Sequence, residues 1–148
     1  MKILILGGDG YIGWPTAMKL SAAGHDVTVA DNYMRRTLMR EIDCDALVDV
    51  PNMHERVAIW KEKTGRDIEV RIGDLDKWDF IDQLFADTMP DTIIHYAEQP
   101  SAPYSMMDVK HAVWTHTNNV SNNLNILYAM KEVVPEAHLV KLGTMGEY

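Results

Sequence analysis

The sequence predicts an α/β protein with a doubly wound parallel sheet, and three observations point to that fold class. Short runs of Ile, Val and Leu recur along the chain, segments with helical periodicity separate them, and a glycine-rich turn follows the first run. Strands that alternate with helices form right-handed crossovers, which place helices on both faces of a parallel sheet. The 148 residues are enough for one domain with a buried core, which we assign to residues 1–148.

Five apolar runs are the expected strands. Their nearly continuous apolarity, without alternation, predicts burial on both faces of the sheet. The runs cover residues 2–6, 26–30, 68–72, 92–97 and 138–143. The first run gives way to a glycine turn and has no cleavage-type segment after it, so we interpret it as a core strand and not as a signal peptide.

Three segments, residues 11–23, 77–88 and 107–133, have the apolar spacing of helices, and the first ends before Gly24, a residue suited to a C-cap. The insert at 32–67 is longer than a minimal crossover requires, so we expect one or two helices and a loop there. The positions expected to face the core are Ile12, Met18 and Leu20 in the first helix, Trp78, Ile81, Leu84 and Phe85 in the second, and Val113, Val120, Leu124, Ile126 and Leu127 in the third.

The composition argues against several classes of function. A formal net charge of −8 argues against a nucleic-acid surface, which needs a basic patch to displace counterions. No run approaches the roughly 20 apolar residues of a membrane span. The six histidines show no metal-ligand spacing with other residues, so we expect no metal. The single cysteine, Cys44, cannot form an internal disulfide, which is consistent with a reducing, cytoplasmic location.

The first expected strand leads directly into the turn "GGDGYIGWP", which has the spacing Gly8-x-Gly10-x-x-Gly13 and also Gly7-x-x-Gly10-x-x-Gly13. In either pattern one glycine permits the tight turn, another lets backbone N–H groups approach a pyrophosphate, and a third lets helix pack on strand. The N-terminus of the following helix then faces the phosphates with unpaired donors. The turn therefore predicts a dinucleotide site in a Rossmann-type sheet with the strand order 3-2-1-4-5.

An acidic residue at the end of the second strand predicts which dinucleotide is bound. Asp31 lies 18 residues after Gly13, where a carboxylate can accept hydrogen bonds from both adenosine ribose hydroxyls and would repel a 2′-phosphate, which favours NAD over NADP. Arg35 and Arg36 are the opposing observation, because arginines here can hold a 2′-phosphate, although pyrophosphate contact or simple surface charge would explain them equally. Asp74 follows the third strand, where an acceptor can meet the adenine amino group or cap a helix.

Further motifs indicate a family. "GGDGYIGW", "MRR", "GDL", "EQPSAPYSMMD", "NNV" and "HLVKLGTMGEY" together resemble the extended short-chain dehydrogenase/reductases (NAD-dependent epimerase/dehydratases), and within them the branch that forms UDP-sulfoquinovose. The resemblance implies tightly bound NAD, a UDP-glucose substrate and sulfite. It also implies oxidation at C4, loss of water across C5–C6, addition of sulfite at C6 and return of the hydride to C4. The long helix at 107–133 often serves this family as a homodimer face, but it could equally be buried against the sheet.

The resemblance also implies roles for individual residues. Those holding the pyrophosphate would be Gly7, Gly10, Tyr11, Ile12 and Gly13. The adenosine ribose would be held by Asp31 and Asn32, with Arg35 and Arg36 nearby. The adenine would be bordered by Asp74 and Leu75, and the nicotinamide half by Tyr96, Ala97 and Asn119. The catalytic hydroxyl would be that of Thr144, although a threonine at this position can also be a simple turn residue. The residues facing the sugar would be Gln99, Ser101, Tyr104, Met145 and Glu147.

Two features depart from the family pattern. Pro100 stands where the family typically has an arginine that contacts the substrate, and proline offers neither charge nor N–H. The 148 residues contain no Tyr-x-x-x-Lys pair, whose tyrosine is the family's base. We therefore expect a NAD-binding half, with the substrate domain absent and no activity on its own. Three interpretations stay open: part of a sulfoquinovose-forming enzyme, part of a UDP-sugar 4-epimerase or dehydratase, or a non-catalytic dinucleotide-binding module.

Overall fold

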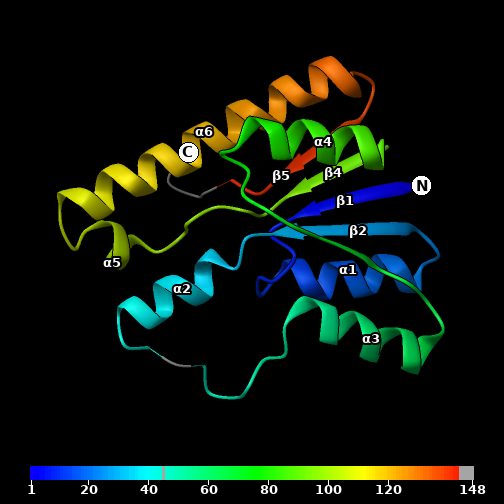
Figure 1. Cartoon of the computed structure of the whole chain (residues 1–148), viewed down its shortest axis with the longest axis horizontal. Helices are drawn as coiled ribbons and strands as arrows, with labels where there is room; N and C mark the ends of the chain where they lie inside the picture. The colour runs from blue at the N-terminus through cyan, green and yellow to red at the C-terminus, as the bar shows by residue number, and fades with distance from the viewer. Residues whose placement is uncertain (45, 144–148) are drawn as a thin grey trace.

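The computed structural model describes residues 1–44 and 46–143, and within them five parallel strands form one sheet in the order β3-β2-β1-β4-β5, as predicted (Figure 1). Parallel pairing runs through every neighbouring pair of strands, and β1 lies at the centre between β2 and β4. The strands are β1 (Lys2–Leu6), β2 (Asp26–Asp31), β3 (Glu69–Ile72), β4 (Thr92–His95) and β5 (His138–Lys141).

Helices lie on both faces of this sheet, with α1 and α3 on one face and α4 and α6 on the other (Figure 1). The insert folds as two helices, α2 and α3, and α3 begins at a capping box in which Asn52 and Glu55 bond each other's backbone N–H groups. Among the described residues no helix is long and apolar enough to cross a membrane. The helices are α1 (Gly13–Ala22), α2 (Met34–Glu41), α3 (Met53–Thr64), α4 (Trp78–Thr88), α5 (Ala102–Ser105) and α6 (Val109–Val133).

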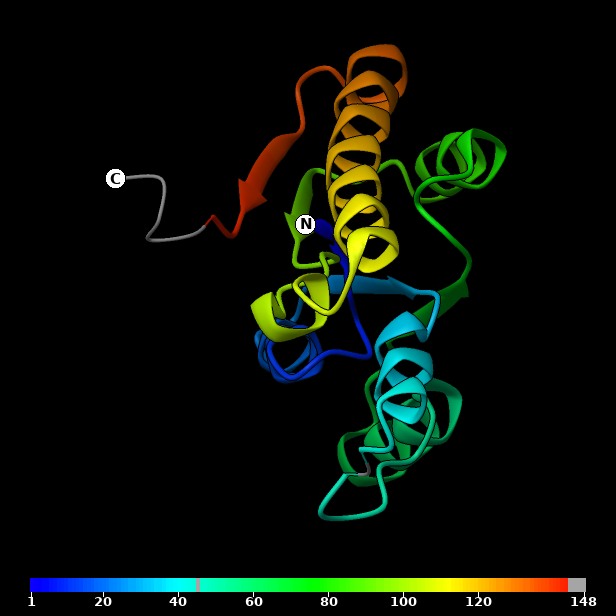
Figure 2. The ribbon, with the colours of Figure 1, turned by 90° about the vertical axis from the view of Figure 1, so that its left-hand side faces the viewer.

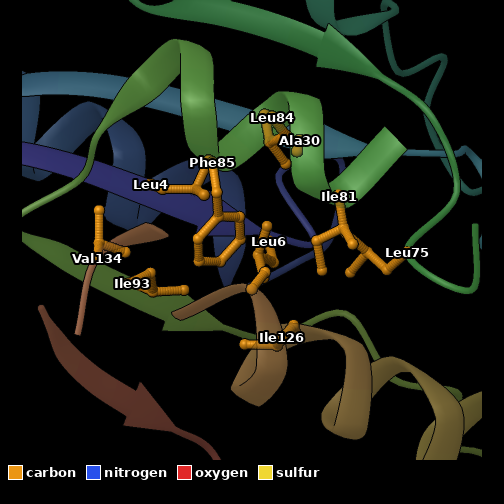
Figure 3. Close-up of a cluster of buried hydrophobic side chains, with 11 residues drawn as sticks. Leu4, Leu6, Ala30, Leu75, Ile81, Leu84, Phe85, Ile93, Ile126 and Val134 are labelled. Carbon is orange, nitrogen blue, oxygen red and sulfur yellow. The ribbon is translucent and has the colours of Figure 1, made fainter. Parts of the chain in front are cut away.

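The core has one apolar layer on each side of the sheet, because successive side chains of β1 point to opposite faces. Leu4 and Leu6 face Phe85 of α4 and Ile126 of α6 (Figure 3), whereas Ile3 and Ile5 belong to the layer under α1 and α3. The predicted burial on both faces holds for β1, β2 and most of β4. It is wrong for β3 and β5, which lie at the two edges of the sheet and are partly exposed.

The prediction for the buried face of α6 was largely wrong. Val113, Val120, Leu124 and Leu127 are 45–59% exposed, and Ile126 is the only predicted core position of this helix that is buried among the described residues. The buried face carries smaller or polar residues as well, namely Asn122 and Ala129. Helical spacing identifies an apolar stripe but does not state what covers it. Ile12 and Trp78 are likewise exposed, at 46% and 37%.

Candidate dinucleotide-binding site

A cleft of about 870 Å³ opens at the carboxyl ends of β1, β2 and β4. Figure 2, which views the molecule from that end, shows α2 and α5 in front of the strand ends. This is the crevice that a doubly wound sheet leaves where its strand order reverses. Arg36 is not part of its lining, and Thr144, Met145 and Glu147 lie outside the described residues. The predicted residues that do line it are Gly7, Gly10, Tyr11, Ile12, Gly13, Asp31, Asn32, Arg35, Asp74, Leu75, Tyr96, Ala97, Gln99, Ser101, Tyr104 and Asn119.

Backbone contacts that exclude a side chain build the glycine turn. Gly7 has a φ of +90°, and a Cβ there would lie 2.8 Å from the carbonyl carbon of Tyr96. A Cβ on Gly13 would overlap the carbonyl oxygen of Gly7. The start of α1 therefore lies directly against the turn, and its N-cap, Ile12, provides no side-chain hydrogen bond. Such a helix end, approached through a loop almost without side chains, is suited to a diphosphate.

The carboxylate of Asp31 is held by backbone donors at the end of β2. Its Oδ2 accepts the N–H of Asp9 at 2.9 Å, and its Oδ1 accepts the N–H of Tyr33 at 2.8 Å. Burial raises the pKa of Asp31, while the hydrogen bonds to the ionised form act in the opposite direction. These two bonds fix the carboxylate at the wall of the cleft, where hydroxyl donors of a ligand would meet it.

Three buried polar atoms of the cleft have no hydrogen-bond partner within the described residues: Asp74 Oδ1, His95 Nε2 and Asn122 Oδ1. Buried polar groups are almost always paired, so unpaired ones that line a cleft favour a polar ligand there. Helix α4 begins after Lys77, which gives it no side-chain cap, and Asp74 makes no side-chain bond to that helix. Between the two roles considered for Asp74, its placement favours contact with a ligand.

Several residues predicted to meet the sugar or the nicotinamide half of the cofactor form hydrogen bonds within the protein. The amide of Gln99 accepts the N–H of Ser101 at 2.5 Å and donates to Thr115 at 3.2 Å. The side-chain amide of Asn119 accepts the backbone N–H of Gln99 and donates to the backbone carbonyl of the same residue. The hydroxyl of Tyr104 donates to Glu41 at 3.0 Å, which ties α5 to the end of α2. Their roles toward a substrate remain predictions.

The other end of the cleft holds a buried histidine. The side chain of His95, at the end of β4, is fully buried, and burial lowers its pKa to about 4. Nearby, Glu98 pairs with Lys141 at 2.9 Å and accepts a hydrogen bond from Asn123, and these bonds lower the pKa of Glu98 against the opposing effect of burial. The described residues contain no group of three or more His, Cys, Asp or Glu that could hold a metal ion.

Sequence reasoning missed an ionic network beside the glycine turn. The carboxylate of Asp9, 8% exposed, pairs with Arg36 of α2 and with Arg56 of α3. Arg56 also lies over the ring of Trp14 at 4.9 Å. The position of Asp9 inside "GGDG" was visible in the sequence, but nothing in the sequence linked it to Arg56, because that contact depends on how the insert folds back.

Comparisons with known proteins agree with the motifs. Residues 3–148 match the NAD dependent epimerase/dehydratase family. The chain is 44% identical to the chloroplastic UDP-sulfoquinovose synthase of Spinacia oleracea over 147 residues, which cover 99% of this chain and 30% of that protein. It is 43% identical to the UDP-sulfoquinovose synthase of Sulfolobus acidocaldarius over 148 residues, which cover all of this chain and 38% of that protein.

The fold is similar to that of solved structures. UDP-glucose 4-epimerase from Bifidobacterium longum, in complex with NAD+ and UDP, matches with a TM-score of 0.75 at 22% identity, covering 98% of this chain and 37% of that one. A similar epimerase from Stenotrophomonas maltophila has a TM-score of 0.73. The chain thus spans well under half the length of the relatives it matches. As its motifs predicted, the chain belongs to the NAD dependent epimerase/dehydratase family.

Proposed function

We propose that this chain is the NAD-binding portion of an enzyme that makes UDP-sulfoquinovose from UDP-glucose and sulfite. The observation that carries the proposal is the juxtaposition, in one cleft, of the glycine turn, the carboxylate of Asp31 and the Oδ1 of Asp74, which has no hydrogen-bond partner in residues 1–44 and 46–143. These are an anion site, an acceptor for ribose hydroxyls and an acceptor for the adenine amino group. NAD has all three chemical groups.

Each residue would then hold one part of the cofactor. The turn at Gly7, Gly10 and Gly13 would hold the diphosphate, Asp31 the adenosine ribose and Asp74 the adenine. The bound nicotinamide would accept and return a hydride at C4 of the sugar. Thr144 follows β5 in the sequence, and we propose its hydroxyl as the group that orients the sugar 4-OH. The single cysteine, Cys44, supports a reducing compartment, for which we propose the cytoplasm.

The identity of 43–44% to two UDP-sulfoquinovose synthases supports sulfite as the second substrate. A UDP-sugar 4-epimerase is the alternative, favoured by Pro100 at the position of a substrate arginine and by a 30% identical UDP-glucose 4-epimerase from Pasteurella multocida. A non-catalytic dinucleotide-binding module is the third interpretation, favoured by the lack of a Tyr-x-x-x-Lys pair in the 148 residues.

Two experiments separate these functions. First, the 148-residue chain should quench or enhance NADH fluorescence in a saturable titration, and a flat titration would contradict the cofactor site. Second, a chimaera in which this chain replaces the aligned part of the Sulfolobus acidocaldarius synthase should form UDP-sulfoquinovose from UDP-glucose only when sulfite is added. UDP-galactose formed regardless of sulfite would indicate an epimerase, and NADH binding without either product would indicate the non-catalytic module.

We also propose that the exposed stripe of α6 is the face of a homodimer. Val113, Val120, Leu124 and Leu127 follow one another at helical spacing, and each is 45–59% exposed. They lie opposite the face with Asn122, Ile126 and Ala129, which packs on the sheet and α4. A second copy would bury this stripe against its own equivalent, as a two-fold interface requires.

The dimer gives a test by substitution. Exchanging Leu124 and Leu127 together for glutamate would place charges at the centre of the interface, so we expect the dimer dissociation constant to rise at least about 30-fold. Sedimentation equilibrium measures the effect, and far-UV circular dichroism checks that α6 is retained. Ile59→Glu, on the exposed side of α3, is the matched control and should leave association unchanged. The dimer would be ruled out if the wild-type chain were monomeric at high concentration as well as after 100-fold dilution.

A further inference from the structure

The guanidinium of Arg36 makes four hydrogen bonds within the protein. Its Nε and Nη2 each donate to the carboxylate of Asp9 at 2.7 Å, a bidentate pair. Nη1 donates to the carbonyl of Val50 and Nη2 to that of Pro51, both at 2.9 Å. This arginine on α2 is therefore anchored to the glycine turn on one side and to the insert on the other. It is not among the residues that line the cleft.

The same carboxylate holds a second arginine. Arg56 of α3 pairs with Asp9 Oδ1 and lies over the face of Trp14. The side chains of Asp9 and Arg56 are 8% and 11% exposed, so solvent screens this pair little. A single buried acid thus pairs with two guanidinium groups that come from two different helices of the insert.

This cluster lies beside the predicted position of the adenosine ribose. The backbone N–H of Asp9 donates to Asp31, the residue that would accept the ribose hydroxyls. Arg36 follows Asp31 by five residues, in the segment where proteins selective for NADP place an arginine that holds the 2′-phosphate. Arg36 thus occupies the position of such a phosphate-binding arginine, but its guanidinium is already paired with the carboxylate of Asp9.

We propose that Asp9 is a specificity-determining residue: it holds Arg36 and Arg56 away from the ribose, so that Asp31 alone faces the 2′ position and the site selects NAD over its 2′-phosphorylated form. The inference rests on the proposed cofactor site and deepens it. It also explains how a site that selects NAD through an acid at the end of β2 can contain the arginine pair "RR" at residues 35–36. Arg35, which lines the cleft, is left for another contact.

The experiment compares the affinities of the 148-residue chain for NADH and NADPH, both followed by nicotinamide fluorescence. Asp9→Asn keeps the size of the side chain but removes its charge, which frees Arg36 to pair with a 2′-phosphate. The ratio of the two dissociation constants should move about tenfold toward NADPH, the effect of one charge-assisted hydrogen bond. Asp9→Asn combined with Arg36→Met should reverse that gain. Asp82→Asn, an exposed acid on α4, removes the same charge elsewhere and should leave the ratio unchanged.

Two results would overturn the inference. One is an Asp9→Asn protein that binds NADH but keeps the wild-type ratio of the NADH and NADPH dissociation constants. An equal loss of affinity for both dinucleotides would count in the same way, because it would show that Asp9 only stabilises the structure. The other comes from Arg36→Met alone, which remains informative if Asp9→Asn fails to fold. We expect that variant to keep the wild-type ratio, whereas a selective loss of NADPH affinity would show that Arg36 already reaches the phosphate. A wild-type chain that binds neither dinucleotide would refute the proposed function itself.

Discussion

Gly13→Ala is expected to weaken NADH binding about 100-fold, the loss of roughly two charge-assisted hydrogen bonds to the diphosphate. The added Cβ would overlap the carbonyl oxygen of Gly7, so the first turn of α1 and the glycine turn must separate. Both partners in this contact are backbone atoms, and neither can move aside by changing a rotamer. We expect an accompanying loss of about 2 kcal/mol in the free energy of unfolding, typical of overpacking. NADH fluorescence and urea unfolding measure the two effects.

Gly65→Ala provides the matched control. Gly65 also has a positive φ, +70°, but a Cβ there would meet no atom of the described residues within 4 Å. It ends α3 and does not line the cleft. The substitution should cost about 1–2 kcal/mol of backbone strain and leave the NADH affinity at the wild-type value. If Gly13→Ala behaved in the same way, with its binding intact, the glycine turn would not be the site of the diphosphate.

The central sheet and the cleft could be predicted from the sequence because their signals are local. The runs that form β1 and β2 are apolar on both faces, and the turn between β1 and α1 has glycine at Gly7 and Gly13, where a Cβ would meet backbone. Asp31 follows from its place at the end of β2. Each of these inferences needs only residues that are neighbours along the chain and the general geometry of a strand–turn–helix unit.

The remaining features depend on contacts between distant segments. Asp9 and Arg56 are 47 positions apart, and they meet only because the insert folds back over the glycine turn. The face of α6 that packs on the sheet carries Asn122 and Ala129, while its leucines face outward, so hydrophobicity alone selected the wrong side. A stripe spaced for burial can be covered by a partner as well as by the chain's own core, and periodicity is the same in both cases.

The buried His95 predicts a marked loss of stability in mild acid. Burial lowers its pKa from the ordinary 6.5 to about 4, opposed by the nearby Glu98 and assisted by Lys141. As pH falls below 6.5, the unfolded chain takes up a proton at this site while the folded protein does not, so the free energy of unfolding decreases until the folded form titrates as well. The decrease between pH 7 and pH 4 should be about 3 kcal/mol from this residue.

His95→Gln isolates that contribution, because glutamine carries no charge at any of these pH values. The variant should start less stable at pH 7, since the imidazole Nδ1 accepts the N–H of Ala97 at 3.3 Å, but its stability should then fall about 3 kcal/mol less between pH 7 and pH 4. Urea unfolding at several pH values gives the comparison, and His54→Gln, at an exposed position of α3, should follow the wild-type profile. Parallel curves for the wild type and His95→Gln would mean that the imidazole takes up its proton over the same pH range in the folded protein as in the unfolded chain. Below pH 6.5 the end of β4 would then present a cation, and not a neutral ring, to whatever occupies the cleft.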